Sequence, residues 1–178
     1  MNYVLAFAGS NSSISINYKL VKYTSSLISG TEVRLRNMAK YPFPMYSYDV
    51  EKENGYSNSL VEFKNEISNA KGLIIAVSEH NSYPSAYFKN TMDWLSRLDS
   101  KFLVDKKILL MSTSTGGRGA IGALEVAEKM ITRFQGTVVE TFSLPRYGNN
   151  FDENTGITNA DLAKIHSEKV SSFVKAIS

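Results

Sequence analysis

Six short polar side chains follow the first apolar segment of the chain. Residues 3–8 are apolar and Gly9 ends the run. The polar residues that come next are Ser10, Asn11, Ser12, Ser13, Ser15 and Asn17. A strand that leads through a small polar loop into a helix directs backbone N–H groups and the positive end of the helix dipole toward an anion. The residue types and their spacing therefore predict a phosphate site, although no basic residue precedes Lys19.

Serine and asparagine also cap helices that bind nothing. One cap is worth about 1 kcal/mol and needs a single such residue, whereas this loop has six in eight positions. From these residues alone, phosphate binding and plain capping remain equally good interpretations.

Two later apolar segments end in the same kind of loop. Residues 73–77 precede the polar stretch Ser78–Ser85, and residues 107–112 precede Thr113–Gly119. Wound parallel sheets bind ligands outside the carboxyl ends of their strands, where the strand order reverses. We therefore expect the three polar loops to meet at one edge of a sheet, which is the strongest indication of function in the residues themselves.

The elements that must position these loops alternate along the chain. Apolar runs predict strands at 3–8, 73–77, 107–112 and 137–142, and the alternation of apolar and charged residues at 32–36 predicts an outer strand. Amphipathic patterns predict helices at 16–28, 60–71, 88–98, 124–134 and 160–177, with Gly136 as the C′ residue of the fourth. The apolar stripe expected on the last helix comprises Leu162, Ile165, Val170, Phe173, Val174 and Ile177. This alternation predicts one α/β domain over residues 1–178, a doubly wound parallel sheet with helices on both faces.

The segment Tyr41–Tyr48 interrupts this order. It contains two prolines and four aromatic residues, so it is neither helix nor central strand. The polar residues up to Asn58 are expected to continue the loop. The aromatic side chains either pack on the body of the domain or line a ligand or a partner subunit.

Composition excludes several classes of function. The chain has 178 residues, 43% of them hydrophobic, and no apolar window that spans a membrane. Because the N-terminal residues lack a secretory signal pattern, we expect a cytoplasmic protein. The absence of cysteine excludes disulfides, thiolate nucleophiles and Cys-ligated zinc, and two histidines make a multi-histidine metal site improbable. A net charge of +3 with interspersed lysines and acids argues against nucleic-acid binding.

Motifs of other enzyme classes are missing or incomplete. The G-x-S-x-G elbow of serine hydrolases and the Walker loop are both absent. Gly117-Arg-Gly-Ala-Ile-Gly122 matches the dinucleotide pattern G-x-G-x-x-G, and Glu140 ends the next strand. However, Thr113–Gly116 lengthens the turn before it, and only one strand–helix unit follows, so we disfavour a dinucleotide site there.

Three motifs together resemble the NADPH-dependent FMN reductase family, flavodoxin-like enzymes that include quinone, azo and chromate reductases. Gly9-Ser-x-Ser-x-x-Ser-x-Asn17-x-x-Leu20 resembles the first loop of that family. Glu79-His-Asn81 followed by Phe88-Lys-Asn-Thr-Met-Asp-Trp94 is similar to its second motif, and Ser112–Gly119 to its third loop. The resemblance spans about Tyr3 to Phe142.

The resemblance implies strand order 2-1-3-4-5, bound FMN and NADPH or NADH as co-substrate. Hydride would pass to flavin N5 and on to a quinone, azo compound, free flavin or similar small-molecule acceptor in a ping-pong cycle, with no catalytic side chain. It also implies a homodimer or homotetramer. The implied FMN contacts are Ser10, Ser12, Ser15, Ile16 and Asn17 for the phosphate, Glu79, His80, Asn81, Ser82 and Tyr83 for the isoalloxazine edge, and Ser114, Gly116, Gly117 and Arg118 for the far rim.

Two departures from the family pattern bear on affinity. The family often has Arg at the position of Ser12 and Pro at the position of Ser78. Loss of that Arg removes a charge-assisted bond worth about 1.5–3 kcal/mol, so we expect weaker FMN binding.

Two alternatives of other classes stay open. One is a flavodoxin-type electron carrier without its own NAD(P)H oxidation, although such carriers are acidic as a group and this chain is basic. The other is a non-flavin nucleotide-binding module.

Overall fold

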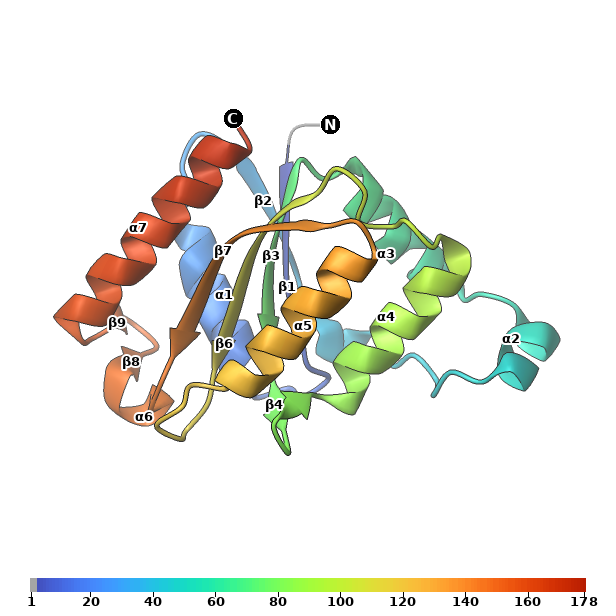
Figure 1. The fold of residues 1–178 in the computed structure, drawn as a ribbon, viewed down its shortest axis with the longest axis horizontal. Helices are drawn as coiled ribbons and strands as arrows, with labels where there is room; N and C mark the ends of the chain where they lie inside the picture. Colours follow the sequence, from blue (N-terminus) through green and yellow to red (C-terminus); the bar gives the residue numbers. More distant parts are fainter. Residues whose placement is uncertain (1–2) are drawn as a thin grey trace.

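The computed structural model describes residues 3–178 and is organised around one five-stranded sheet (Figure 1). Its strands are β1 (Tyr3–Gly9), β2 (Glu32–Arg36), β3 (Gly72–Val77), β6 (Lys107–Thr113) and β7 (Thr137–Leu144). They are all parallel, in the order β2-β1-β3-β6-β7, which confirms the predicted order 2-1-3-4-5. The chain runs outward from β1 to β2 and then crosses back to β3, so the strand order reverses between β1 and β3.

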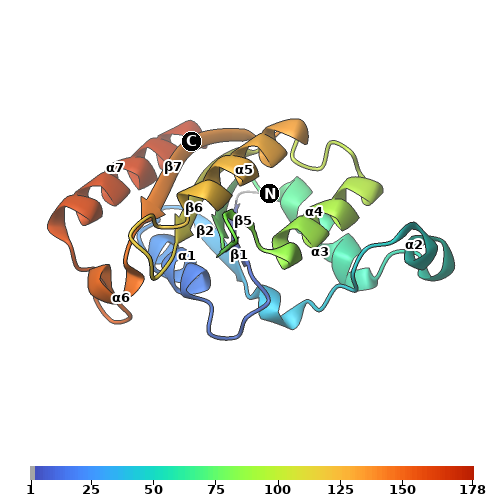
Figure 2. The same cartoon turned by 60° about the horizontal axis from the view of Figure 1, so that its bottom comes forward.

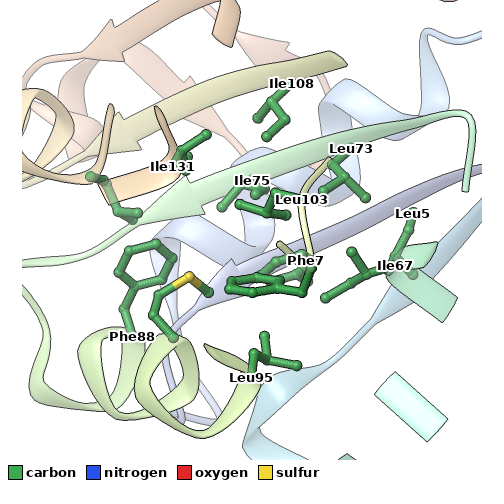
Figure 3. Close-up of a cluster of buried hydrophobic side chains, with 14 of the residues drawn as sticks. Leu5, Phe7, Ile67, Leu73, Ile75, Phe88, Leu95, Leu103, Ile108 and Ile131 are labelled. Atoms are coloured by element: carbon green, nitrogen blue, oxygen red, sulfur yellow. The ribbon is translucent and has the colours of Figure 1, made fainter. Parts of the chain in front are cut away.

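Each central strand contributes side chains to two hydrophobic cores, one on either face of the sheet. In β1, Tyr3, Leu5 and Phe7 belong to one core, whereas Val4, Ala6 and Ala8 belong to the other. This is why the strand is apolar at every position rather than at alternate ones. Figure 3 shows part of the first core, where side chains of β1, β3 and β6 meet those of the helices that cover this face.

Five long helices cover the two faces (Figure 1). α1 (Ile16–Ser26) and α7 (Ala160–Ala176) pack on one face. α3 (Asn58–Asn69), α4 (Ala86–Leu98) and α5 (Ile121–Arg133) pack on the other. These are the predicted helices. In the part of the chain that the structure describes, none of the helices combines the length and apolar character needed to cross a membrane.

The prediction of a continuous loop to Asn58 is wrong, because α2 (Tyr48–Asn54) forms within it. The hydroxyl of Ser47 accepts a hydrogen bond from Val50 N at 3.2 Å and caps the helix. Asp49 and Glu51 stand in its first turn, where carboxylates favour a helix. Tyr46 and Arg97 both donate to the Glu51 carboxylate, at 2.8 and 3.0 Å, and fasten α2 at the periphery of the molecule (Figure 1).

The other unpredicted elements are short. They are a 3-10 turn (Met38–Lys40), the hairpin β4 (Glu79–His80) and β5 (Tyr83–Pro84), α6 (Tyr147–Asn150), and the hairpin β8 (Phe151–Asp152) and β9 (Gly156–Ile157).

The end of α5 differs from the prediction that Gly136 is its C′ residue. The helix ends at Arg133, and Gln135 occupies the left-handed C′ position with φ of 68°. Gly136 comes one residue later and donates its N–H to Ile131 O at 3.0 Å. The bond closes the six-residue loop of a Schellman motif.

The buried face of α7 also differs by one residue from the predicted stripe. Ile165 is 44% exposed, whereas His166 is 1% exposed. His166 fits there because its Nε2 lies 2.9 Å from the Thr24 hydroxyl, and its ring stacks on Tyr23 and meets the edge of Phe142. A satisfied polar group thus takes a core position that hydropathy assigns to its neighbour.

Candidate functional site

The loops after β1, β3 and β6 meet at one edge of the sheet and line a cleft of about 320 Å³. Figure 2 turns this edge forward. The first loop and the start of α1 contribute Ser10, Ser12, Ile14, Ser15, Ile16 and Asn17. The second loop contributes Ser78, Glu79 and His80, and the third Thr113, Ser114 and Thr115. The predicted convergence of three polar loops at the point of strand reversal is therefore present.

Asn17 ties the three loops together. Its side-chain oxygen accepts from Thr113 N at 2.9 Å, and its Nδ2 donates to Thr113 O at 3.1 Å and to the Ser78 hydroxyl at 3.3 Å. The residue is 3% exposed. Its side chain therefore holds the rim of the cleft, and only its main chain is available to a ligand. The hydroxyl at Ser78, where the family often has proline, serves as one of the acceptors.

Three serines of the first loop accept hydrogen bonds from the backbone of that loop and of the first turn of α1. Ser10 Oγ accepts from Ser12 N at 3.2 Å, and Ser12 Oγ from Ile14 N at 3.4 Å. Ser15 is the N-cap of α1 and accepts from Tyr18 N at 3.2 Å. Capping thus occurs as one interpretation predicted, but a hydroxyl that accepts keeps its O–H to donate.

Two backbone donors of the cleft lining have no partner among the residues that the structure describes. They are the N–H groups of Ile16 and Asn17. Both residues belong to the first turn of α1, where helix N–H groups point outward along the axis. Together with the hydroxyls of Ser10, Ser12 and Ser15 these two groups form a set of neutral donors, which is suited to a phosphate dianion.

The cleft provides this donor set without a formal positive charge. No lysine or arginine is among its described lining residues. Lys19 forms an ion pair with Glu153 and lines a neighbouring groove, which shares Ser15 with the cleft. Within residues 3–178, no three His, Cys, Asp or Glu side chains are grouped so that they could hold a metal ion.

The second loop is a tight hairpin with its tip in solvent. Asn81 and Ser82 connect β4 to β5 and have φ of 53° and 67°, as two-residue hairpin turns require. Glu79 turns its carboxylate to α5 and accepts from Ala123 N at 3.0 Å. It thereby caps a helix whose own N-cap residue is alanine. His80 and Tyr83 are exposed beside the cleft, together with the two turn residues.

Glycines of the G-x-G-x-x-G stretch serve close packing. A Cβ on Gly119, which has φ of +60°, would lie 2.3 Å from the Ser143 hydroxyl. A Cβ on Gly122 would lie 2.9 Å from Ser82 O, so this glycine lets α5 approach the hairpin. The spacing that resembles a dinucleotide fingerprint therefore has a structural origin here.

The rest of the third loop lies outside the cleft lining. Ser114 lines the cleft, whereas Gly116, Gly117 and Arg118 are exposed beyond it. Gly116 O accepts from Arg146 N at 2.9 Å, which ties this loop to the end of β7. The residues predicted for the far rim are thus split between the cleft and the surface next to it.

Known proteins resemble this chain in sequence and in fold. A quinone reductase of Escherichia coli (strain K12) is 29% identical over 122 residues, covering 63% of this chain and 65% of that protein, which is less than two thirds of its length. The NADH-dependent flavin reductase subunit 2 of Lactobacillus johnsonii is 26% identical over 161 residues, covering 86% of this chain and 84% of that protein. The structure of a flavoenzyme NAD(P)H:(acceptor) oxidoreductase from Paracoccus denitrificans superposes with a TM-score of 0.80 at 23% identity, covering 99% of this chain and 97% of that one.

A family model decides the relationship. The model for NADPH-dependent FMN reductase matches residues 2–148, a range that contains all three loops of the cleft. The resemblance carried by the three sequence motifs is thus confirmed over most of the chain, and the sheet order and the donor set agree with it. The chain belongs to the NADPH-dependent FMN reductase family.

Proposed function

We propose that the protein is an NAD(P)H-dependent oxidoreductase that uses FMN to reduce a quinone, azo compound, free flavin or similar acceptor. The observation that carries this proposal is the set of unpaired N–H groups and serine hydroxyls at the start of α1, at the point where strand order reverses. The family assignment supports the same cofactor. When bound, FMN supplies the redox chemistry, by taking up a hydride at N5 and passing both electrons to the acceptor.

The residues of the chain would hold and orient the cofactor. Ser10, Ser12, Ser15, Ile16 and Asn17 would bind the phosphate, the last two through their main-chain N–H groups. The hairpin Glu79–Tyr83 would support the edge of the ring system, with Ser114 and the exposed Gly116–Arg118 at the far rim. Because the Glu79 carboxylate is engaged by α5, its contact with the ring edge would come from its backbone.

The side chains that line the cleft favour a mechanism without a side-chain acid or base. Glu79 is occupied as a helix cap, and His80 is exposed to solvent, from which protons are directly available. As the resemblance implies, we expect NAD(P)H and the acceptor to react in turn, in a ping-pong cycle. We also expect a cytoplasmic homodimer or homotetramer, as the resemblance implies.

An FMN titration followed by a turnover assay tests the proposal. We expect saturable quenching of FMN fluorescence by the protein, and steady-state oxidation of NADPH or NADH by the loaded protein with a quinone acceptor and no added reductase. FMN binding without NAD(P)H oxidation would instead indicate a flavodoxin-type carrier. Absence of FMN binding would favour a module for another nucleotide.

The variant His80→Ala tests whether a side chain takes part in the chemistry. We expect a fall in kcat of no more than about threefold at saturating FMN, since the His80 side chain is exposed and the neighbouring backbone keeps its strand pairing. General acid–base catalysis contributes about a hundredfold or more, so a thousandfold loss would contradict this mechanism. The measurement is the steady-state kcat of His80→Ala, compared with that of the parent and of the control Tyr48→Ala, since Tyr48 does not line the cleft.

A further inference from the structure

A groove of about 360 Å³ runs from the phosphate end of the cleft along one face of α1. Successive turns of the helix, starting from its cap, contribute Ser15, Tyr18, Lys19, Lys22, Tyr23 and Ser26 to the lining. Residues spaced three or four positions apart share one face of a helix, so the stripe is about 16 Å long. Ser15 lines the groove and the cleft alike. A ligand bound at the start of α1 can therefore extend into the groove.

The hairpin of β8 and β9 forms the opposite wall of the groove and is fixed against α1. It contributes Phe151, Glu153 and Asn154 to the lining. The ring of Tyr23 meets the ring of Phe151 edge-on, with centroids 5.7 Å apart and an interplanar angle of 88°. A Cβ on Gly156, which has φ of +84°, would collide with the Tyr23 ring, so this glycine lets the hairpin approach the helix. The groove is therefore present before a ligand binds.

The lining of the groove combines positive charge with aromatic side chains. Two lysines and one glutamate leave one net positive charge. Lys19 pairs with Glu153, whereas Lys22 is exposed and has no ion-pair partner in the described part of the chain. Tyr18 and Tyr23 add aromatic faces. Lysine binds phosphate as a point charge, and aromatic side chains stack on nucleic-acid bases. The groove thus suits a nucleoside phosphate.

The cleft and the groove differ in charge. The described lining of the cleft offers neutral donors and no cation, whereas the groove beside it holds Lys19 and Lys22. A terminal phosphate carries nearly two negative charges at pH 7. Each phosphate of a pyrophosphate ester carries only one. A pyrophosphate that spans the two hollows would place one charge on the neutral donors and the other near the lysines, which matches the distribution of cations.

We propose that the groove along α1 binds the adenylate half of FAD, so that the protein takes this dinucleotide as well as FMN. The flavin half would occupy the cleft, with its phosphate at the start of α1. The second phosphate would lie near Lys19 and Lys22, and the adenine would stack on an aromatic side chain of the groove. The inference rests on the proposed function, because it uses the phosphate position proposed there, and it adds a second cofactor to it.

Calorimetric titration of the flavin-free protein with FAD and with FMN, at 0.15 M salt, tests the proposal. The parent should bind FAD at least as tightly as FMN. In Lys22→Glu we expect the Kd of FAD to rise about tenfold, because repulsion replaces attraction at the second phosphate. The Kd of FMN should change by less than about threefold. Lys22 follows Ser15 by about 10 Å along the helix axis, and salt screens exposed charges over about 8 Å.

Two control variants separate a local contact from a change in net charge. Lys129→Glu alters the charge of the protein by the same amount, but Lys129 is exposed on α5, which covers the other face of the sheet, and it does not line the groove. Both Kd values should stay within about twofold of the parent in this variant. Lys22→Arg keeps the positive charge and should keep the Kd of FAD within about twofold as well.

The failure of this inference is distinguishable from the failure of the proposed function. If Lys22→Glu shifted the Kd values of FAD and FMN by the same factor, or shifted neither, the adenylate site would be wrong while FMN binding stood. A parent that bound FMN but bound FAD tenfold more weakly would overturn the adenylate site in the same way. A parent that bound neither flavin would overturn the proposed function and this inference with it.

Discussion

Replacing Asn17 with alanine is expected to lower the free energy of unfolding by about 2–4 kcal/mol, because buried polar partners lose their hydrogen bonds. In the parent protein the Asn17 amide accepts from Thr113 N and donates to Thr113 O and to the Ser78 hydroxyl. Alanine makes none of these bonds, and the site, where Asn17 is 3% exposed, gives water little access.

The same variant is expected to weaken FMN binding by about tenfold, equivalent to roughly 1.4 kcal/mol. The main-chain N–H groups proposed to hold the phosphate belong to Ile16 and Asn17. Their direction depends on the first turn of α1, which the Asn17 side chain fixes against the end of β6. Urea denaturation of the apoprotein and FMN fluorescence titration at a temperature where the variant is folded measure the two effects separately.

An aspartate at the same position makes the test sharper. Asn17→Asp keeps an acceptor for Thr113 N but places a negative charge against Thr113 O, in a cleft without a described cation. Repulsion between the new carboxylate and a phosphate dianion bound at the start of α1 is worth a few kcal/mol at most. We therefore expect FMN affinity to fall by about a hundredfold. Ser13→Ala, on the exposed part of the same loop, should change stability by less than about 0.5 kcal/mol. Equal FMN affinity in Asn17→Asp and the parent would contradict the proposed phosphate position.

The sheet and the location of the cleft follow from sequence because both depend on local patterns. Runs such as residues 73–77 are apolar at every position, which indicates a strand covered on both faces, and the polar residues that follow them mark its carboxyl end. Parallel strands bring those ends to one edge. The residue pattern alone therefore assigns the three loops to one site.

The roles of individual side chains could not be predicted, because they depend on distant partners. Glu79 belongs to a family motif, yet its carboxylate caps α5 through Ala123, 44 residues later. Asn17 resembles a phosphate ligand, but its side chain forms hydrogen bonds with the backbone of Thr113, 96 residues away. A pattern of residue types identifies the loop that forms a site, whereas the direction of each side chain is set by what packs against it.

The short helix α2 could not be predicted for a different reason. A helix of seven residues shows too little hydrophobic periodicity to be recognised. The segment before it, with two prolines and four aromatic residues, indicates a loop. Ser47, with Asp49 and Glu51 after it, was the available signal of a helix start.

The buried His166 is expected to make the protein lose stability as the pH falls from about 6.5 to 4. Burial lowers the pKa of His166 from 6.5 to about 4. The side chains in contact with it, Thr24, Tyr23 and Phe142, are uncharged and give the protonated form no compensation. The unfolded chain therefore binds a proton in this range that the folded protein excludes.

The direction and the size of the change in the free energy of unfolding follow from that difference in proton binding. Stability from His166 is complete above pH 6.5 and is lost progressively toward pH 4, with a total of about 3 kcal/mol. Carboxylates of lowered pKa, such as Glu51 and Glu140, lose their contribution only below about pH 4.5. The interval between pH 6.5 and 5 therefore isolates the histidine.

Urea denaturation of the apoprotein at several pH values across this interval measures the effect without the added stability that a bound ligand gives. The parent should lose about 2 kcal/mol between pH 6.5 and 5. In His166→Gln, which keeps a polar partner for the Thr24 hydroxyl but cannot be protonated, the dependence should be nearly flat. His80→Gln removes the other histidine, which is exposed, and should retain the full slope. The same slope in His166→Gln and the parent would show that the proton is taken up elsewhere, because no other buried histidine exists in a chain with two.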